Sequence, residues 1–378
     1  MKILLVVWAA NRMGGAEVYS ESLALGLSQR GHQVTIACYE ASPRVQSEVR
    51  VVNIPRPQFA GWRIIWRLAT QLLRIHWSRH LGKLQGCNPD VIVFSPSVCY
   101  RAIVKRFPGV PTIYLPHSRI APLEVADGLP TGLATWLARR THHASEREAS
   151  IRCAAIVRFT PSLARLHLSY YNLPPTTPIA VIPQAIHFPS HPPNPRRGAC
   201  RAVAVGRLVA SKNLPLLVSG LRGIPKTGWK VDIVGDGPQR SLLEANVAAA
   251  SVQDCVAFHG HQNDPNPFFE TADFLAFPSR LENFSLVVLE AMAHGVPALV
   301  MLADNRTYFN VHSELLCDGI DGFIAEDEAD FHRRMRSLLL DPQPARALAA
   351  AARKKASPHA WPLVLDEWES LLARITHM

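Results

Sequence analysis

The stretch PSRLENFSLVVLEAMAHGVPALV, residues 278–300, places one carboxylate before an apolar run and another within it. Glu282 precedes the run and Glu290 lies inside it, with seven residues between them. One interpretation is a solvated loop acid followed by an acid on a helix surface. The other is a pair of polar groups that hold two parts of one bound molecule. The pattern of the whole chain is needed to choose between them.

Within this stretch, the residues after Glu282 predict a helix with defined ends. Ser285 is a suitable N-cap, residues 286–294 a helix, Gly295 its left-handed C-terminal residue and Pro297 a stop. The first backbone N–H groups of such a helix have no partner inside it, so they form a site for a phosphate. One glutamate before that site and one beyond it would then hold hydroxyls on either side of a diphosphate.

The rest of the chain alternates short apolar runs with helix-like segments, which indicates parallel sheets wrapped by helices. In the first half, residues 14–32 predict a helix, and the expected strands are KILLVVWA (2–9), QVTIACY (33–39), PDVIVFSP (89–96) and PTIYLPHS (111–118). The expected strands of the second half are RAVAVGRL (201–208), WKVDIVGDGP (229–238), VAFHG (256–260), ADFLAFPS (272–279) and VPALVM (296–301).

A proline-rich segment, residues 173–198, separates the two patterns and predicts an interdomain linker. The sequence therefore predicts an N-terminal domain over 1–185 and a C-terminal domain over 186–357. A final amphipathic helix lies within 358–378.

Composition excludes several classes of protein. The chain has 378 residues, 48% of them hydrophobic, which suffices for two cores. Its seven cysteines are scattered without a C-x-x-C pair, which argues against a disulfide framework and a zinc site and favours a reducing compartment. The apolar N-terminus is interpreted as a buried strand rather than a signal peptide, and no run approaches the ~20 residues of a membrane span.

The net charge of +10 is unevenly distributed. Residues 1–190 carry 21 Lys and Arg against 9 Asp and Glu, whereas residues 191–378 carry 19 against 21. The first half is therefore expected to meet an anionic partner such as membrane lipid, a phosphorylated glycan or nucleic acid.

Several polar residues follow expected strands, where ligands bind in open α/β folds. Arg207 and Lys212 follow one strand and suit a diphosphate, although two surface cations in a loop are common. His117 ends another strand, and a lone histidine is more often structural. Gly14 and Gly15 let a backbone approach a ligand, but taken alone they fit an ordinary βα turn.

Together these pieces resemble the retaining glycosyltransferases of family 4, which have the GT-B fold of two facing Rossmann-like, doubly wound domains with a cleft between them. The resemblance spans nearly the whole chain in order. The resemblance rests on GGAE (14–17), His117, GRLVASKN (206–213), GDGP (235–238) and the E-x7-E run ENFSLVVLE (282–290).

The resemblance implies a role for each matched residue. Gly15 would let its loop approach the donor phosphate, and His117 would lie near the transferred sugar. Arg207 and Lys212 would bind the donor diphosphate and stabilise the leaving nucleotide. Glu282 would contact sugar hydroxyls. The remaining donor contacts would come from the backbone of Phe284, Ser285 and Leu286 and from Glu290, which would hold the ribose.

The chain also departs from the family pattern. Asn283 and Ser285 stand where glycines are usual, QAIH (184–187) replaces a common N-G-V/I-D, and residues 301–321 replace a Gly-rich loop. No D-x-D motif is present for a metal ion, so we expect a metal-independent transfer without a cofactor. Retention without an obvious carboxylate nucleophile favours a front-face route. The donor base and sugar, the acceptor and the oligomeric state are not predicted.

The acceptor is inferred from residues 59–83, which carry five basic residues and no acidic ones. Aromatic and basic side chains alternate at helical spacing, including Trp62, Arg63, Trp66, Arg67 and Arg74. The pattern fits an interfacial membrane helix, and equally a core-packed helix with a solvated basic face. The basic first half favours membrane contact.

The resulting hypothesis is a cytoplasmic enzyme, peripheral on the inner face of the membrane, that moves a sugar from a UDP- or GDP-sugar to a lipid-linked, lipopolysaccharide or polysaccharide acceptor. The alternatives are a nucleotide-sugar epimerase of the same fold and an inactive glycan- or nucleotide-binding relative. No nucleic-acid-binding module is recognisable.

Overall fold

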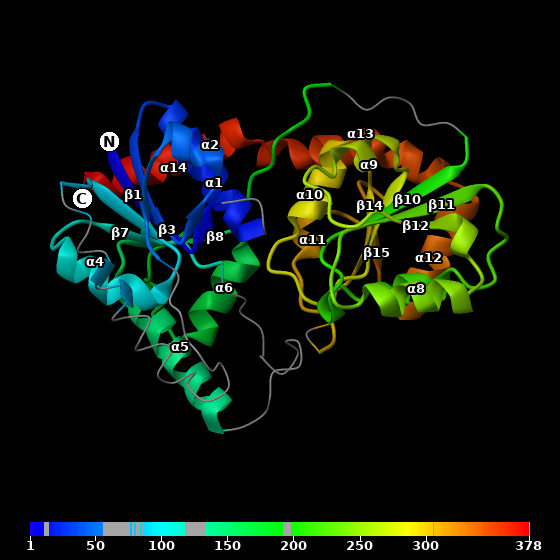
Figure 1. Cartoon of the computed structure of the whole chain (residues 1–378), viewed down its shortest axis with the longest axis horizontal. Coiled ribbons are helices and arrows are strands. Elements are labelled where there is room, and N and C mark those ends of the chain that lie inside the picture. Colours follow the sequence, from blue (N-terminus) through cyan, green and yellow to red (C-terminus); the bar gives the residue numbers. More distant parts are fainter. Residues whose placement is uncertain are drawn as a thin grey trace. The chain divides into compact units, whose positions relative to one another are not determined.

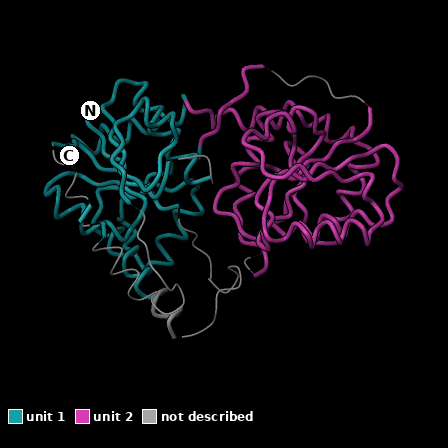
Figure 2. Tube along the Cα trace, in the orientation of Figure 1, with its two compact units in different colours: residues 1–120, 128–184, 362–378 teal, residues 121–127, 185–361 magenta. Residues whose placement is uncertain are grey.

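The computed structural model describes residues 1–10, 15–55, 76–77, 79–80, 84, 86–117, 133–191, 198–304 and 306–377. The chain forms two compact units, each built on its own sheet (Figures 1 and 2). The first unit contains the described residues up to Gln184 together with the C-terminal residues from Pro362. The second contains Ala185–Trp361. The sequence predicts domain boundaries after residues 185 and 357, whereas the chain passes from one unit to the other after Gln184 and after Trp361.

In the described part of the first unit, seven parallel strands have the order β5-β3-β1-β6-β7-β8-β9. These strands are β1 (Lys2–Val6), β3 (Gln33–Cys38), β5 (Arg50–Asn53), β6 (Val91–Phe94), β7 (Thr112–Tyr114), β8 (Ala155–Arg158) and β9 (Ile179–Val181), with a separate small pair β2 (Ala9–Ala10) and β4 (Glu40–Ala41). The helices are α1 (Gly15–Gln29), α2 (Pro43–Glu48), η1 (Ser97–Cys99), α4 (Tyr100–Arg106), α5 (Leu133–Arg152), α6 (Pro161–Tyr170) and α14 (Trp361–Thr376). Figure 1 shows α1, α2 and α14 on one face of the sheet and α4 and α5 on the other.

In the described part of the second unit, six parallel strands have the order β12-β11-β10-β13-β14-β15. They are β10 (Cys200–Val205), β11 (Trp229–Val234), β12 (Val256–Phe258), β13 (Phe274–Phe277), β14 (Ala298–Met301) and β15 (Phe323–Ala325). The helices are η3 (Ala210–Lys212), α7 (Leu214–Gly220), α8 (Arg240–Ala249), η4 (Gln253–Cys255), α9 (Asn266–Thr271), α10 (Leu286–Ala293), α11 (His312–Leu315), α12 (Glu328–Leu340), α13 (Gln343–Ala356) and η5 (Ser357–His359). Figure 1 shows α9, α10 and α13 on one face and α8 and α12 on the other.

The central strands are mostly apolar because helices cover both faces of each sheet. In β6, β8, β13 and β14 every residue is buried. In both units the chain runs outward in one direction from the first strand and then restarts on its other side. Each sheet therefore has a switch point, at the carboxyl ends of β1 and β6 in one unit and of β10 and β13 in the other.

The proline-rich segment is not wholly a linker, so that prediction is partly wrong. Residues 179–181 form β9, which pairs with β8 and completes the edge of the first sheet. The structure also contains β5, β8 and β15, which the sequence reading did not identify. All three are short, at four, four and three residues, and a run of that length gives little periodicity.

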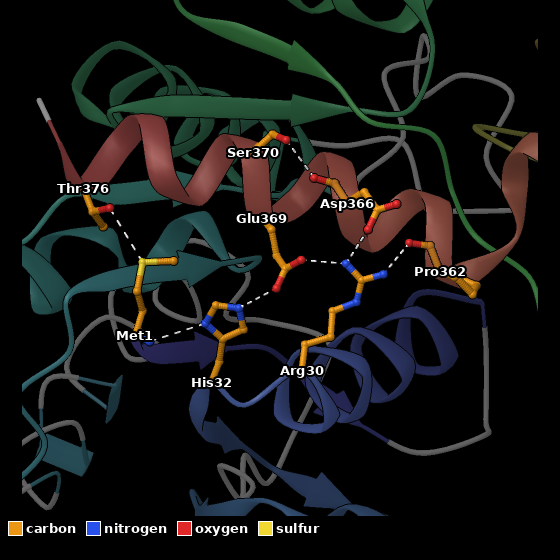
Figure 3. Close-up of polar contacts among 8 residues, drawn as sticks. All are labelled: Met1, Arg30, His32, Pro362, Asp366, Glu369, Ser370 and Thr376. Atoms are coloured by element: carbon orange, nitrogen blue, oxygen red, sulfur yellow. Dashed lines mark hydrogen bonds and ion pairs between the residues drawn. The ribbon is translucent and has the colours of Figure 1, made fainter.

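The C-terminal helix α14 is fastened to α1 by charged groups (Figure 3). The Arg30 guanidinium donates to Asp366 Oδ1 at 2.5 Å, to Glu369 Oε2 at 2.6 Å and to Pro362 O at 2.6 Å. His32 Nε2 lies 2.9 Å from the other Glu369 oxygen. Apolar packing continues this contact, because a Cβ on Gly26 would lie 2.6 Å from Leu365 Cδ1. The helix that follows the second unit in sequence thus belongs to the first.

Candidate active site

The loops after β10 and β11 interlock at the carboxyl edge of the second sheet. A Cβ on Gly235 would lie 1.9 Å from Gly206 O, and Gly235 has a φ of +140°, so the close approach requires glycine there. Gly206 N donates to Val234 O and Leu208 N donates to Asp236 O, both at 2.9 Å. The loop after β11 therefore fixes the backbone on both sides of Arg207.

Asp236 does not cap the helix that follows it. The helix α8 begins at Arg240 with Gln239 at its N-cap position. Asp236 Oδ1 instead accepts a hydrogen bond from Gly237 N at 2.7 Å. The carboxylate stabilises the turn itself.

Lys212 and Glu282 form an ion pair at the switch point, although seventy residues separate them. Ser279 Oγ lies 2.6 Å from the same Glu282 oxygen, and the Lys212 ammonium lies 5.0 Å from the centre of the Phe277 ring. The two charged side chains are 19% and 10% exposed, so they remain within reach of a ligand. Glu282 is also fixed through its backbone N–H, which donates to Phe309 O at 2.8 Å.

Arg207 lies two residues beyond β10 at the same edge, and its side chain is exposed. Within the described residues its guanidinium has no ion pair, in contrast to Lys212. A cation that is held by a rigid loop and not neutralised by a neighbour can bind an anionic ligand without first losing a partner.

The helix α10 begins after Ser285, as the sequence predicts, and its last residue is Ala293; Gly295, with a φ of +66°, follows the C-cap residue His294. Val288 N and Leu289 N both donate to Ser285 O, at 3.0 and 3.2 Å. In the described part of the chain, the N–H groups of Leu286 and Val287 have no acceptor. The first turn therefore offers free donors to an anion.

Glu290 lies in the second turn of α10 and is partly buried. Loss of solvent, with a smaller effect from Asp264, raises the pKa of its carboxyl group to about 7. Among the described residues its carboxylate has no hydrogen bond or ion pair. Glu290 is therefore not part of the Lys212–Glu282 pair, and the two glutamates have different surroundings.

In the first unit, His117 lies three residues beyond β7. Burial, and then the positive charge of Arg158, lower the pKa of its imidazole to about 4, so the ring is neutral at pH 7. The ring centre lies 5.7 Å from that of Tyr19 and 5.6 Å from that of Phe159. Tyr19 belongs to α1, whose first residue is Gly15, so His117 packs against the N-terminal half of that helix.

Some predicted residues lie outside the described residues. They are Gly14 and the segment with Trp62, Arg63, Trp66, Arg67 and Arg74. Among the residues that are described, no group of three or more His, Cys, Asp or Glu side chains could hold a metal ion. Nor does any helix in that part of the chain combine the length and apolar character needed to cross a bilayer.

Sequence reasoning missed two residues that contact the site. Ser279 bonds to Glu282, and the fully buried His312 lies 2.9 Å from Ser285 Oγ through its Nε2. Ser279 is the last residue of the expected strand 272–279, so its position was a usable signal. His312 lies within the segment 301–321, which departs from the family pattern, and its contact depends on tertiary packing.

Comparison with known proteins identifies the chain. Residues 13–188 match the model for Glycosyltransferase Family 4, and residues 194–355 match the model for Glycosyl transferases group 1. The amylovoran biosynthesis glycosyltransferase AmsD of Erwinia amylovora is 25% identical over 46% of this chain, and the match spans about half of that relative, 48%. The glycogen synthase of Mycobacterium tuberculosis is 26% identical over 94% of this chain and 90% of its own length.

A solved structure gives the same fold. Anabaena Alr3699/HepE, in complex with UDP and glucose, matches with a TM-score of 0.76 at 16% identity and covers 99% of this chain and 100% of that one. Both halves of the chain thus match models of sugar-transferring enzymes, and the whole follows one fold. The chain is a glycosyltransferase with the GT-B fold, of the family-4 and group-1 type that these models describe.

Proposed function

We propose that this enzyme transfers a sugar from a UDP- or GDP-sugar to a lipid-linked, lipopolysaccharide or polysaccharide acceptor, with retention at the anomeric carbon and without a metal ion. The observation that carries the proposal is the Lys212–Glu282 pair beside the open first turn of α10. Cations, free amides and a carboxylate meet at the switch point of the second sheet, where α/β folds bind ligands.

The leaving group of such a transfer is a nucleoside diphosphate, which gains negative charge as the glycosidic bond breaks. Arg207, Lys212 and the amides of α10 would stabilise that charge from fixed positions. Glu282 would accept hydrogen bonds from sugar hydroxyls, and Glu290 from the ribose. His117, neutral at pH 7, would hydrogen-bond the transferred sugar.

The acceptor proposal rests on charge. The first half of the chain carries a large excess of Lys and Arg, which would attract the enzyme to an anionic membrane surface on the cytoplasmic side. Among relatives, one is named for amylovoran biosynthesis and another is a glycogen synthase, so glycan acceptors of different kinds occur in this family.

A thermal-shift screen with UDP-, GDP- and ADP-sugars tests the donor. A ligand at 100 times its Kd raises the free energy of unfolding by about 2.7 kcal/mol, so the true donor gives a clear shift. If neither the UDP-sugars nor the GDP-sugars shift the unfolding temperature, the proposed donor class is refuted, whatever the ADP-sugars do.

Anomeric configuration and intermediates test the mechanism. Once donor and acceptor are identified, NMR of the first product should show the same anomeric configuration as the donor. Activity should persist in EDTA. A trapped covalent glycosyl-enzyme would refute the front-face route, and inversion would refute retention.

A further inference from the structure

Ser285, at the start of α10, bonds to a histidine rather than to its own helix. It occupies the N-cap position, yet its side chain accepts no hydrogen bond from the first turn. Its Oγ instead lies 2.9 Å from His312 Nε2. Both residues are buried, with 2% and 0% of their surface exposed, so this contact is shielded from water.

The direction of that hydrogen bond follows from the other imidazole nitrogen. His312 Nδ1 lies 3.1 Å from Met301 O, and a carbonyl oxygen only accepts, so Nδ1 carries the proton. Burial lowers the pKa of His312 to about 4, which keeps the ring neutral and makes Nε2 an acceptor. The Ser285 hydroxyl therefore donates its hydrogen to His312.

Serine at an N-cap normally turns its oxygen toward the amides of the second or third helical residue. Here the hydroxyl is directed to His312, and in the described residues the amides of Leu286 and Val287 have no acceptor. His312 is itself held in place, because its ring meets the Phe277 ring edge-on with centres 5.8 Å apart. That same Phe277 ring lies under the Lys212 ammonium.

We propose that His312 is a positioning residue that holds the Ser285 hydroxyl away from the first turn of α10, so that its amides remain free for the donor diphosphate. This inference rests on the proposed function, since it concerns the same donor site. It also explains how the chain tolerates serine at a position where its family usually has glycine, which has no side chain to cap the helix.

Without His312, Ser285 is free to rotate and cap α10, and the diphosphate must displace that cap. An N-cap side chain contributes about 1 kcal/mol, so the expected loss of nucleotide affinity is about five-fold. A ring of similar size that cannot accept a hydrogen bond isolates this effect from packing. His312→Phe is that variant.

The experiment is a double-mutant cycle measured by isothermal titration calorimetry with UDP, GDP and ADP. The chains compared are the wild type, His312→Phe, Ser285→Ala and the double variant, each checked for cooperative thermal unfolding. His312→Phe should weaken binding about five-fold when Ser285 is present. In the Ser285→Ala background, which has no hydroxyl to cap the helix, it should have no effect.

Each outcome separates the hypotheses. An equal loss in both backgrounds means that His312 acts only through packing, and no loss in either means that the hydroxyl does not compete. Both overturn the inference but leave the donor site intact. If the wild type binds none of the three nucleotides, the proposed function fails first. His312→Gln, whose amide oxygen can accept from Ser285, should retain more affinity than His312→Phe. If His312→Phe does not fold, His312→Leu, which also cannot accept a hydrogen bond, replaces it in the cycle.

Discussion

Replacing Glu290 by glutamine separates the cost of burying its carboxylate from its proposed use. Burial raises the pKa of Glu290 from 4.5 to about 7, which corresponds to about 3 kcal/mol of destabilisation once the group is ionised. Because the pKa is higher in the folded than in the unfolded chain, the protonated carboxyl favours the folded state. The wild type therefore keeps its full stability below pH 4.5 and loses about 3 kcal/mol of it as the pH rises through 7. Glu290→Gln should therefore stabilise the second unit by up to ~3 kcal/mol at pH 8 and by little at pH 5.

Urea unfolding of wild type and variant at pH 8 and pH 5 measures this difference. Glu270→Gln is the matched control, because Glu270 is an exposed glutamate of the same unit, on α9, and should show no pH-dependent gain. A gain for Glu290→Gln that is equal at both pH values, or no gain at pH 8, would refute the reasoning about desolvation.

The same substitution should weaken nucleotide binding although it stabilises the fold. If the ribose needs an ionised Glu290, the competent fraction falls from about one half at pH 7 to about one eleventh at pH 6, a loss of roughly five-fold in affinity. Calorimetry with UDP at the two pH values checks this, and the Glu290→Gln variant should bind weakly without that pH dependence. Equal affinity of the wild type at pH 6 and 7 would remove Glu290 from the ribose site.

Three further predictions address other parts of the molecule. Glu282→Gln should mainly slow transfer, with kcat falling more than nucleotide affinity in steady-state assays; a change in stability alone would favour a structural role. Arg30→Met should destabilise the first unit by about 1–2 kcal/mol in urea unfolding, because Arg30 joins α1 to α14 through charge-assisted bonds (Figure 3), whereas Arg44→Met removes one exposed pair and should change it by less than about 0.5 kcal/mol. The wild type should sediment with anionic liposomes and lose that binding on replacement by Glu of the three residues Arg63, Arg67 and Arg74; absence of wild-type binding would end the membrane proposal.

Periodicity and strand-end residues predicted most of the fold because both sheets bury their central strands on both faces. The apolar runs of β1 and β14 are unmistakable, and the glycine at residue 295 marks the end of α10 as expected. Strand β9 was not predicted because it is an edge strand of only three residues and lies between proline-rich segments. Edge strands need few apolar residues, so their composition resembles a loop.

The site was harder to predict than the fold because its geometry depends on pairs that are distant in sequence. Lys212 and Glu282 each carry a motif signal, but their ion pair is visible only once β10 and β13 lie side by side. Ser285 stands at the N-cap position that its propensity predicts, but its side chain bonds to His312 and not to the helix amides. Local propensity predicted where α10 begins and could not predict what its first turn leaves free.

Two features of the second unit each cost stability in the free chain, and a third makes its ligand compete with a side chain. The carboxylate of Glu290 is partly buried and has no hydrogen-bond donor among the described residues, and the first amides of α10 lack acceptors there. Lys212 is held by Glu282, so any anion that binds it must compete with that carboxylate. Hydroxyls on Glu290 and phosphate oxygens on the amides would relieve the two costs, and a second set of hydroxyls on Glu282 would free Lys212 to bind the diphosphate. A nucleotide diphosphate alone supplies the first two, and only the intact nucleotide sugar supplies the third. The intact donor should therefore stabilise this unit more than the free nucleotide does, and equal stabilisation by the two would mean that Glu282 does not meet the sugar.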